Sequence, residues 1–369
     1  MTRAESSFQT VHPGEVLKGE LEKRGIKHKD FAATVGMPAS MLSDIIKGKR
    51  NITPDISILL EAALGIQASS WLRLQAERDL EVARAKEALL RKQQDIKTWQ
   101  CVQDYCDVKY LEKALPAGLG KSIREKIDSV FAFFNVKSEE ELKDAFIRDL
   151  DPAFFRKSSK LSYDPVSLFT WKQIAYNSCA QQEELKKFNP SALPQIIEEL
   201  KSVISEDNET IERVTAIMRK HGIRFIILDN EKGIHVDGFS FWRGANPSIV
   251  LTLRHKKIDV FAFTLMHEVC HVFCHLNSKE KSRSFISLSD LKDSIEEKEA
   301  DVFANNVLLP AKEWQLFKEE NARTNPYKMG SRIRAFANEH KIHPAIVLGR
   351  YQHDFNVYDN GRGFDRAIR

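Results

Sequence analysis

Long apolar runs are missing from this sequence. No stretch reaches the roughly 18 apolar residues that a membrane helix needs, and the segment 1–13 lacks the apolar core and the cleavage-like site of a signal peptide. Internal repeats and low-complexity tracts are absent as well. These absences predict a chain without a membrane segment and without a repeat architecture.

Cysteines are few and form no recognisable pair. The chain has five, an odd number, and no two of them lie in a C-x-x-C motif: Cys101, Cys106, Cys179, Cys270 and Cys274. This pattern argues against a disulfide framework and favours free thiols in a reducing compartment. We therefore expect a cytoplasmic protein.

A strong net charge is also missing. The 56 basic and 52 acidic side chains leave a net charge of only +4, so any nucleic-acid footprint must be local. Apolar residues make up 42% and charged residues 29% of the 369 residues, which fits globular domains. At roughly 150 residues per domain, the length predicts two or three domains.

The pattern along the chain predicts a mainly helical protein with a small α+β domain. We expect an N-terminal five-helix domain, a helical connector, an α+β domain with a three-stranded meander sheet, and a C-terminal helical extension. These parts correspond to residues 1–78, 79–165, 166–325 and 326–369.

The first 78 residues form a series of short helical patterns. The second pattern, about His28–Val35, and the third, Ala39–Lys47, are separated by the turn residues Gly36-Met37-Pro38. Two short helices joined by a tight turn, with a polar face on the second, match the helix-turn-helix plan. The alternative is a helical packing module that binds a protein instead of DNA.

The polar face of the segment Ala39–Lys47 provides candidate DNA contacts, because such a helix enters the major groove. The candidates for base edges are Ser40, Ser43, Asp44 and Lys47. Those for phosphates are Lys47, Lys49 and Arg50. Asp44 either accepts from a cytosine amino group or is an internal partner of Lys47.

The hydrophobic period changes after Gly222. Three strands are predicted there, at Ile223–Leu228, Ile234–Phe241 and Ile249–Leu253. Gly238 marks a possible bulge in the second strand. A long apolar helix at 259–276 and another at about 295–309 follow.

The first of these two helices contains the pattern H-E-x-x-H at His267, Glu268 and His271. Residues four apart lie on one face of a helix, so the two imidazoles can bind one zinc ion. Zinc lowers the pKa of its bound water to about 7, and a neighbouring carboxylate such as Glu268 can take the proton. The alternative is a pair of histidines on an amphipathic helix; the preceding strands and the apolar flanks favour the metal.

Catalytic zinc normally has three protein ligands, and the acidic helix after the motif is the candidate source of the third. Glu297 and Asp301 are four residues apart, at one edge of the face that turns inward. Glu297 is the predicted ligand. Asp301 is predicted to bond the outer nitrogen of a ligand histidine and so to select its tautomer.

Several neighbours leave alternatives open. Glu296 and Glu299 compete with Glu297 for the metal, and the whole acidic run is otherwise a solvated first turn stabilised by the helix dipole. His275 lies one turn past His271. It either supports the ligands or contacts substrate, or it is a packed core histidine.

Two motifs resemble the ImmA/IrrE family of metallopeptidases. They are Phe263-Thr264-Leu265-Met266-His267-Glu268-Val269-Cys270-His271, and Glu297-x-Glu299-Ala300-Asp301-x-Phe303-Ala304 followed by Leu308-Leu309-Pro310. The likeness covers about Trp171–Leu316. It implies a gluzincin-like site in which His267, His271 and Glu297 bind zinc and Glu268 is the general base. Asp301 would support the ligands without binding the metal, at a position where many members carry Asn. Members typically pair with helix-turn-helix repressors or cleave them.

Three N-terminal segments resemble the HigA-type antitoxins of the XRE helix-turn-helix family. They are His12-Pro13-Gly14-Glu15-Val16-Leu17, Gly48-Lys49-Arg50-x-Ile52-Thr53-Pro54 and Leu60-Glu61-Ala62-Ala63-Leu64-Gly65. This likeness covers about Val11–Arg78. It implies a homodimer that binds a palindromic operator, and fusions with an ImmA/IrrE-like domain occur among antitoxin-like regulators.

Together the patterns predict a DNA-binding regulator with a zinc-dependent endopeptidase domain. The expected partners are a double-stranded DNA operator and a protein, either a substrate repressor or a cognate toxin, with no membrane involved. Two alternatives stay open: a non-catalytic repressor whose zinc domain is a sensor or scaffold, and an antitoxin that blocks a toxin sterically.

Overall fold

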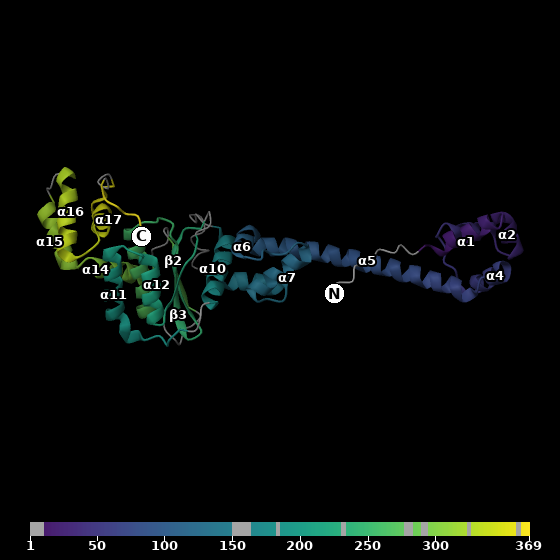
Figure 1. The fold of residues 1–369 in the computed structure, drawn as a ribbon, viewed down its shortest axis with the longest axis horizontal. Helices are drawn as coiled ribbons and strands as arrows, with labels where there is room; N and C mark the ends of the chain where they lie inside the picture. The colour runs from purple at the N-terminus through teal and green to yellow at the C-terminus, as the bar shows by residue number, and fades with distance from the viewer. Residues whose placement is uncertain are drawn as a thin grey trace. The chain divides into compact units, whose positions relative to one another are not determined.

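The structure is a computed structural model. It describes residues 11–149, 164–181, 185–229, 234–276, 283–288, 294–322, 326–358 and 363–369. The chain divides into two compact units, Met1–Trp99 and Gln100–Arg369 (Figure 1).

Short helices build the N-terminal unit. They are α1 (Pro13–Lys23), α2 (His28–Thr34), α3 (Ala39–Ile46), α4 (Pro54–Leu64) and the first part of α5 (Ala68–Tyr105). The His12 ring caps α1 by accepting from the backbone N–H of Gly14, and the Thr53 hydroxyl caps α4. The pair α2 and α3 forms the predicted helix-turn-helix.

The start of α1 lies against the end of α3 at Gly14. A Cβ at Gly14 would lie 2.1 Å from the carbonyl oxygen of Ile45, so only glycine permits this close approach. The apolar core beneath the contact draws on all five helices, and its buried members include Leu17, Leu21, Phe31, Leu42, Ile45, Leu60 and Trp71. This packing holds α3 in place within the unit.

The predicted connector, residues 79–165, is helical where the structure describes it; residues 150–163 lie outside the described segments. After α5 come α6 (Val108–Ala114), α7 (Ile123–Phe134) and α8 (Glu139–Asp149), which precede α10 (Pro165–Ala180). The rings of Phe134 and Phe146 both contact Phe169 of α10. Both α7 and α8 therefore pack against α10 within the larger unit.

The larger unit also contains a small sheet. Its strands are β1 (Arg224–Ile227), β2 (Val236–Arg243), β3 (Asn246–Leu251) and β4 (Ser284–Leu288), in the order β1-β3-β2-β4. The mainly helical fold with a small α+β part is confirmed. The three-stranded meander is wrong in two respects, because β4 adds a fourth strand and β1 pairs in parallel with β3. The predicted bulge lies between Val236 and Gly238.

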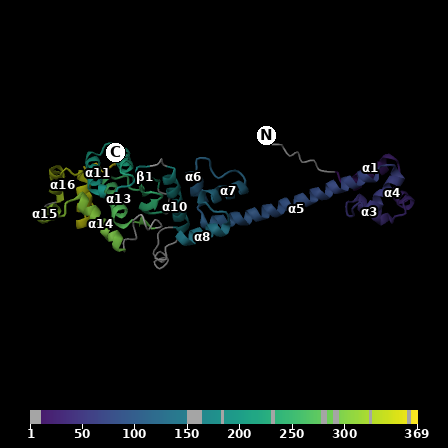
Figure 2. The same cartoon turned by 90° about the horizontal axis from the view of Figure 1, so that it is seen from below.

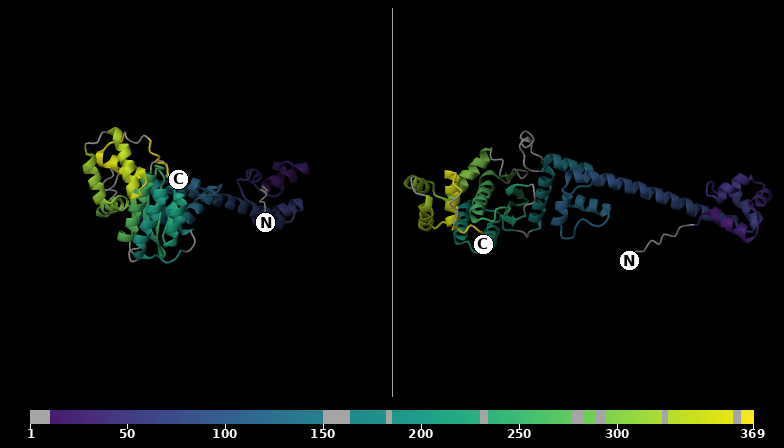
Figure 3. Two further views of the ribbon diagram at one scale, coloured as in Figure 1. Left: turned by 60° about the vertical axis from the view of Figure 1, so that its left-hand side comes forward. Right: turned by 90° about the horizontal axis from the view of Figure 1, so that it is seen from above.

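Helices cover the sheet and surround α13, the helix that carries the H-E-x-x-H motif. The helix α13 spans Ile258–Cys270 and continues into η3 (His271–His275). The others are η2 (Pro190–Ala192), α11 (Leu193–Glu206), α12 (Thr210–Lys220), α14 (Ile295–Leu308), α15 (Ala311–Asn321), α16 (Pro326–His340) and α17 (Pro344–Phe355). α13 contacts α14, α17, β2 and β3, and Figures 2 and 3 show the same ribbon from three further directions. It is apolar nearly all round, as a helix at the centre of a core must be.

The expectation for the cysteines is also met: all five are free thiols. Among the described residues, no helix combines the length with the apolar character that crossing a bilayer requires.

Candidate metal centre

The helix α13 carries the H-E-x-x-H motif into the middle of the larger unit. His267 is 4% exposed, and His271 and Glu268 are fully buried. At His271 the α-helix passes into a single π-helical turn that ends at His275. Such turns are rare and frequently occur at functional sites.

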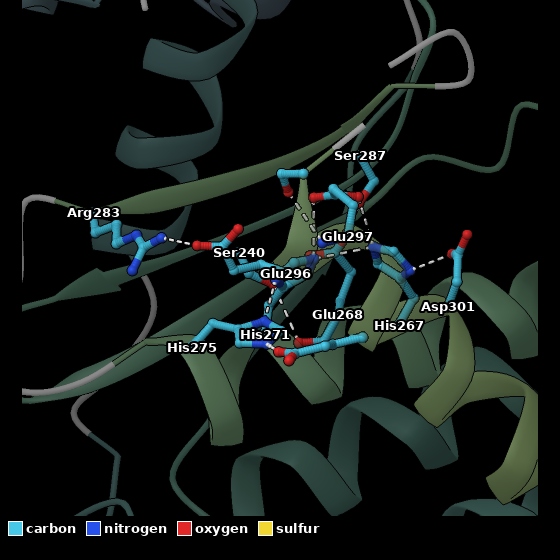
Figure 4. Close-up of polar contacts among 12 residues, drawn as sticks. Ser240, His267, Glu268, His271, His275, Arg283, Ser287, Glu296, Glu297 and Asp301 are labelled. Carbon is cyan, nitrogen blue, oxygen red and sulfur yellow. Dashed lines mark hydrogen bonds and ion pairs between the residues drawn. The ribbon is translucent and has the colours of Figure 1, made fainter. Parts of the chain in front are cut away.

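The side chains of His267, His271 and Glu297 meet between α13 and the first turns of α14 (Figure 4). Nε2 of His267 lies 3.0 Å from Nε2 of His271 and 3.1 Å from Oε2 of Glu297. Nε2 of His271 lies 3.3 Å from Oε1 of Glu297. The structure thus brings the three predicted ligands to one point.

This donor set fits a divalent metal ion. Asp301 accepts a hydrogen bond from Nδ1 of His267, so the lone pair of Nε2 faces the Glu297 carboxylate, which is also an acceptor. Acceptors in this arrangement repel each other unless a cation lies among them. Tetrahedral zinc, with bonds of about 2.0–2.2 Å, would place its ligand atoms roughly 3.3–3.6 Å apart, and the separations here, 3.0–3.3 Å, are only slightly shorter.

A proton can take the place of the metal ion between these ligands. Burial lowers the pKa of His267, but hydrogen bonds to Asp301 and Glu297 outweigh it and raise the pKa to about 9. Burial raises the pKa of Glu297, but contacts with His267 and His271 lower it to about 2. Glu297 is therefore an anion at neutral pH, and its charge must be balanced by a proton on the histidines or by a metal ion.

Each ligand histidine has a polar contact at Nδ1, the ring nitrogen that does not face the shared centre. Oδ1 of Asp301 lies 2.9 Å from Nδ1 of His267, as Figure 4 shows. Nδ1 of His271 lies 2.9 Å from Nδ1 of His275, whose Nε2 lies 3.1 Å from Oε2 of Glu299. These contacts orient the imidazoles so that both Nε2 atoms point at the shared centre.

The competing acids of α14 point elsewhere. Glu296 forms an ion pair with Arg283, and Glu299, 61% exposed, bonds to His275. Successive helical residues are turned by about 100° around the helix axis, so neighbours of Glu297 cannot share its direction. The Ser294 hydroxyl accepts from the backbone N–H of Glu297 and caps the helix at this point.

The carboxylate of Glu268 is held by two serine hydroxyls that the sequence motifs did not single out. Ser240 of β2 donates to Oε2, and Ser287 of β4 donates to Oε1 at 2.6 Å. A Cβ at Gly238 would lie 2.2 Å from Oε1 of Glu268, so glycine leaves room for the carboxylate. The only local signal for this arrangement is the two-residue spacing of Gly238 and Ser240, which places both on one face of a strand.

The predicted DNA contacts lie on the surface of the N-terminal unit. Ser43 is half-buried, and the others are exposed: Ser40, Asp44, Lys47, Lys49 and Arg50. The residues of α3 and its cap that face outward are three, four and seven positions apart and lie opposite the buried Leu42 and Ile45. The backbone carbonyl of Asp44 accepts from the N–H groups of Lys49 and Arg50, which ties the basic turn to α3.

Two family models match separate parts of the chain. Residues 17–71 match a family model described as helix-turn-helix. Residues 218–340 match the peptidase M78 model, described as IrrE N-terminal-like domain. The second span contains the whole sheet, the H-E-x-x-H motif and Glu297.

Two solved structures similar to the N-terminal residues are an addiction module antidote protein of a HigA family from Coxiella burnetii and Pseudomonas aeruginosa antitoxin HigA with its higBA promoter. They are 28% and 29% identical to this chain, and each match covers 23% of it with a TM-score of 0.22. The matches cover 95% and 94% of those chains.

Two curated relatives are virulence-associated proteins I and A of Dichelobacter nodosus, 32% identical over 79 residues and 42% identical over 67 residues. These matches cover 73% and 66% of the relatives but only 21% and 18% of this chain. The chain therefore belongs to the XRE-type helix-turn-helix family through its N-terminal residues and carries an IrrE-like domain of the M78 peptidase family in its C-terminal part.

Proposed function

We propose that this chain is a DNA-binding, antitoxin-like transcription regulator whose C-terminal part is a zinc-dependent endopeptidase. The observation that carries the peptidase is the convergence of His267, His271 and Glu297, whose ligand atoms lie within 4.8 Å of one another. The buried carboxylate of Glu268 lies on the same helix. The proposed substrate is a protein, either a repressor or a cognate toxin.

The two histidines and Glu297 would hold zinc, which supplies a Lewis acid that polarises a peptide carbonyl and acidifies water. Asp301 keeps Nδ1 of His267 as the donor, so that Nε2 stays free for the metal. The pair His275 and Glu299 does the same for His271. These contacts pre-orient the ligands and reduce the cost of assembling the site.

Glu268 would act as the general base. Its carboxylate accepts a proton from the attacking water and then delivers it to the leaving amine. The hydroxyls of Ser240 and Ser287 hold the carboxylate in position through hydrogen bonds. Gly238 leaves the space that this position of the carboxylate needs.

The deciding experiment compares the wild-type chain with His267→Ala and Glu268→Gln. Each protein is assayed for zinc by mass spectrometry, for DNA binding by gel shift, and for cleavage of the repressors and toxins encoded beside its gene. We expect zinc and cleavage in the wild type, and loss of zinc in His267→Ala. Glu268→Gln should keep zinc and DNA binding but lose at least about 100-fold in cleavage rate. Equal cleavage by Glu268→Gln would rule out its role as the base.

The N-terminal unit is proposed to bind a double-stranded DNA operator in the cytoplasm. The exposed residues of α3 would read base edges, and Lys47, Lys49 and Arg50 would contact phosphates. Removing a phosphate contact, as in Lys49→Gln, should weaken binding to all sequences and make it less salt-dependent. Replacing Ser40 by Ala should instead change the preferred sequence. A gel-shift series at several salt concentrations separates the two effects.

The proposed assembly is a homodimer joined along α5. Val82, Leu89 and Ile96 are 52%, 58% and 40% exposed and follow one another at seven-residue steps. This spacing places them on one stripe of the helix, as in the a positions of a coiled coil. In a parallel pair, Glu81 would lie at a g position and Lys86 at an e position, so that each faces the opposite charge on the partner.

A second candidate function is a zinc-dependent sensor or toxin-binding scaffold without turnover. The observation that favours it is the enclosure of Glu268, which is fully buried and already accepts hydrogen bonds at both carboxylate oxygens. This reading predicts zinc without cleavage in the wild type and no effect of Glu268→Gln. It also predicts that His267→Ala changes toxin or operator binding.

A further inference from the structure

A cavity of about 340 Å³ lies between α13, α14, α17 and the last residues of the chain. Small-molecule sites in proteins have volumes of roughly 300–1,000 Å³, so this cavity can hold a compact organic ligand. It is separate from the point where His267, His271 and Glu297 meet, since none of the three lines it. The proposed DNA contacts also lie outside this cavity.

Five apolar side chains line the cavity. Val260 and Phe263 come from α13, Leu308 and Leu309 come from the end of α14, and Ile346 comes from α17. These side chains form an apolar surface that favours binding of an aromatic or branched aliphatic group, because burying such a group removes apolar area from water. The wall therefore requires a ligand with an apolar part.

One end of the cavity carries a cationic group that can bind an anion. Nε of Arg350 donates to Asp354 at 3.0 Å, and its terminal guanidinium nitrogens make no hydrogen bond within the described part of the chain. Asp354 also lies 3.9 Å from Nζ of Lys318, so two full positive charges share one carboxylate. Of these two basic side chains, Arg350 is the one that lines the cavity.

Two further charged groups of the wall balance each other, and a third is hydrogen-bonded within the protein. Arg366 forms a bidentate ion pair with Asp259, and Gly349 lets α17 come close to that pair: a Cβ there would lie 2.8 Å from Oδ2 of Asp259. Asp301 also lines the cavity, but its carboxylate bonds to His267. Arg350 therefore provides the charge that a ligand can neutralise.

We infer that this cavity is a binding site for a small amphipathic organic anion, with one carboxylate or sulfonate at Arg350 and an apolar body against Phe263, Leu308 and Ile346. The site shares Asp301 with the metal centre, which makes it suited to an effector of the regulator. The inference does not depend on zinc or on peptidase activity.

The test uses 8-anilinonaphthalene-1-sulfonate, a fluorescent aromatic sulfonate, titrated into the full chain. We expect saturable binding at one site. N-phenyl-1-naphthylamine, which has the same aromatic body without the sulfonate, should bind at least tenfold more weakly. Equal or tighter binding of the neutral probe would overturn the anion assignment, and no saturable binding of the sulfonate would overturn the site.

Two variants locate the probe. Arg350→Gln removes the cationic group and should weaken sulfonate binding at least fivefold while leaving the neutral probe unaffected. Val260→Trp fills the cavity and should abolish binding of both probes. Arg213→Gln changes a surface arginine on α12, outside the cavity, and should bind both probes like the wild type. Thermal melting of each variant verifies that it is folded, and unchanged binding by folded Arg350→Gln and Val260→Trp would refute the site.

Discussion

Oδ1 of Asp301 accepts a hydrogen bond from Nδ1 of His267 at 2.9 Å and thereby determines which ring nitrogen is free for a metal. A histidine that donates through Nδ1 presents its Nε2 lone pair, and here that atom lies beside Nε2 of His271 and the Glu297 carboxylate. The tautomer of one ligand is thus controlled from α14, the same helix that supplies the third ligand.

Replacement of Asp301 tests this control. Asp301→Ala should weaken zinc binding by about 10–100-fold, because His267 can then adopt the wrong tautomer or rotate. Asp301→Asn keeps an oxygen acceptor in the same place and should lose less. Competition against a fluorescent zinc chelator measures both. Identical affinities for Ala, Asn and Asp at this position would show that the contact has no role in metal binding.

The pH dependence of zinc binding follows from the raised pKa of His267. In the metal-free protein its pKa is about 9, so at pH 7 a proton occupies the position that zinc needs. Zinc binding should release about one proton, and affinity should rise by up to tenfold per pH unit until pH 9. Calorimetry in two buffers of different ionisation enthalpy measures the released proton; equal heats in both buffers would exclude it.

The metal-free chain should show the matching dependence of stability on pH. The folded pKa of His267 lies above its unfolded value of about 6.5, so the folded state binds the proton more tightly. Its contribution to the free energy of unfolding is complete below pH 6.5 and is lost as pH rises through 9. Urea unfolding of zinc-free protein at pH 6 and pH 9 measures the loss, and His267→Ala should lack it.

Gly238 tests the pocket around Glu268. In Gly238→Ala the added methyl group would lie 2.2 Å from Oε1 of Glu268, so the carboxylate must move. We expect a loss of about 1–3 kcal/mol in unfolding free energy and loss of the proposed cleavage, with zinc content unchanged. Gly330→Ala on α16 is the control, because its methyl group would meet nothing closer than 3.6 Å. If both variants behave like the wild type, the pocket does not constrain Glu268.

The dimer proposal can be tested within one helix. Leu89→Glu places a charge on the stripe of Val82, Leu89 and Ile96 and should weaken dimerisation at least tenfold. Leu90 is 57% exposed, almost the same as Leu89 at 58%, but lies off the stripe. Leu90→Glu should therefore dimerise normally. Sedimentation equilibrium of both variants distinguishes a specific stripe from a general effect of charge.

Local patterns predicted the elements more reliably than their partners in space. The four-residue spacing of His267 and His271 depends only on the helical repeat, so the metal-binding face could be predicted before any tertiary contact was known. Strand pairing was different. The chain between β2 and β4 includes all of α13, and the short pattern of β4 did not reveal that it would join β2 and bring Ser287 to Glu268.

The sequence by itself determined the helix-turn-helix and the presence of two imidazoles and a carboxylate on one helix, because each depends on a short-range period or a turn residue. The tertiary structure decided which acid of α14 reaches the centre, since that depends on the rotation of α14 against α13. It also decided that Ser240 and Ser287 enclose Glu268 and that α13, α14 and α17 leave a cavity at Arg350. Those features arise where elements distant in the chain pack together, and no local spacing encodes the angle at which they meet.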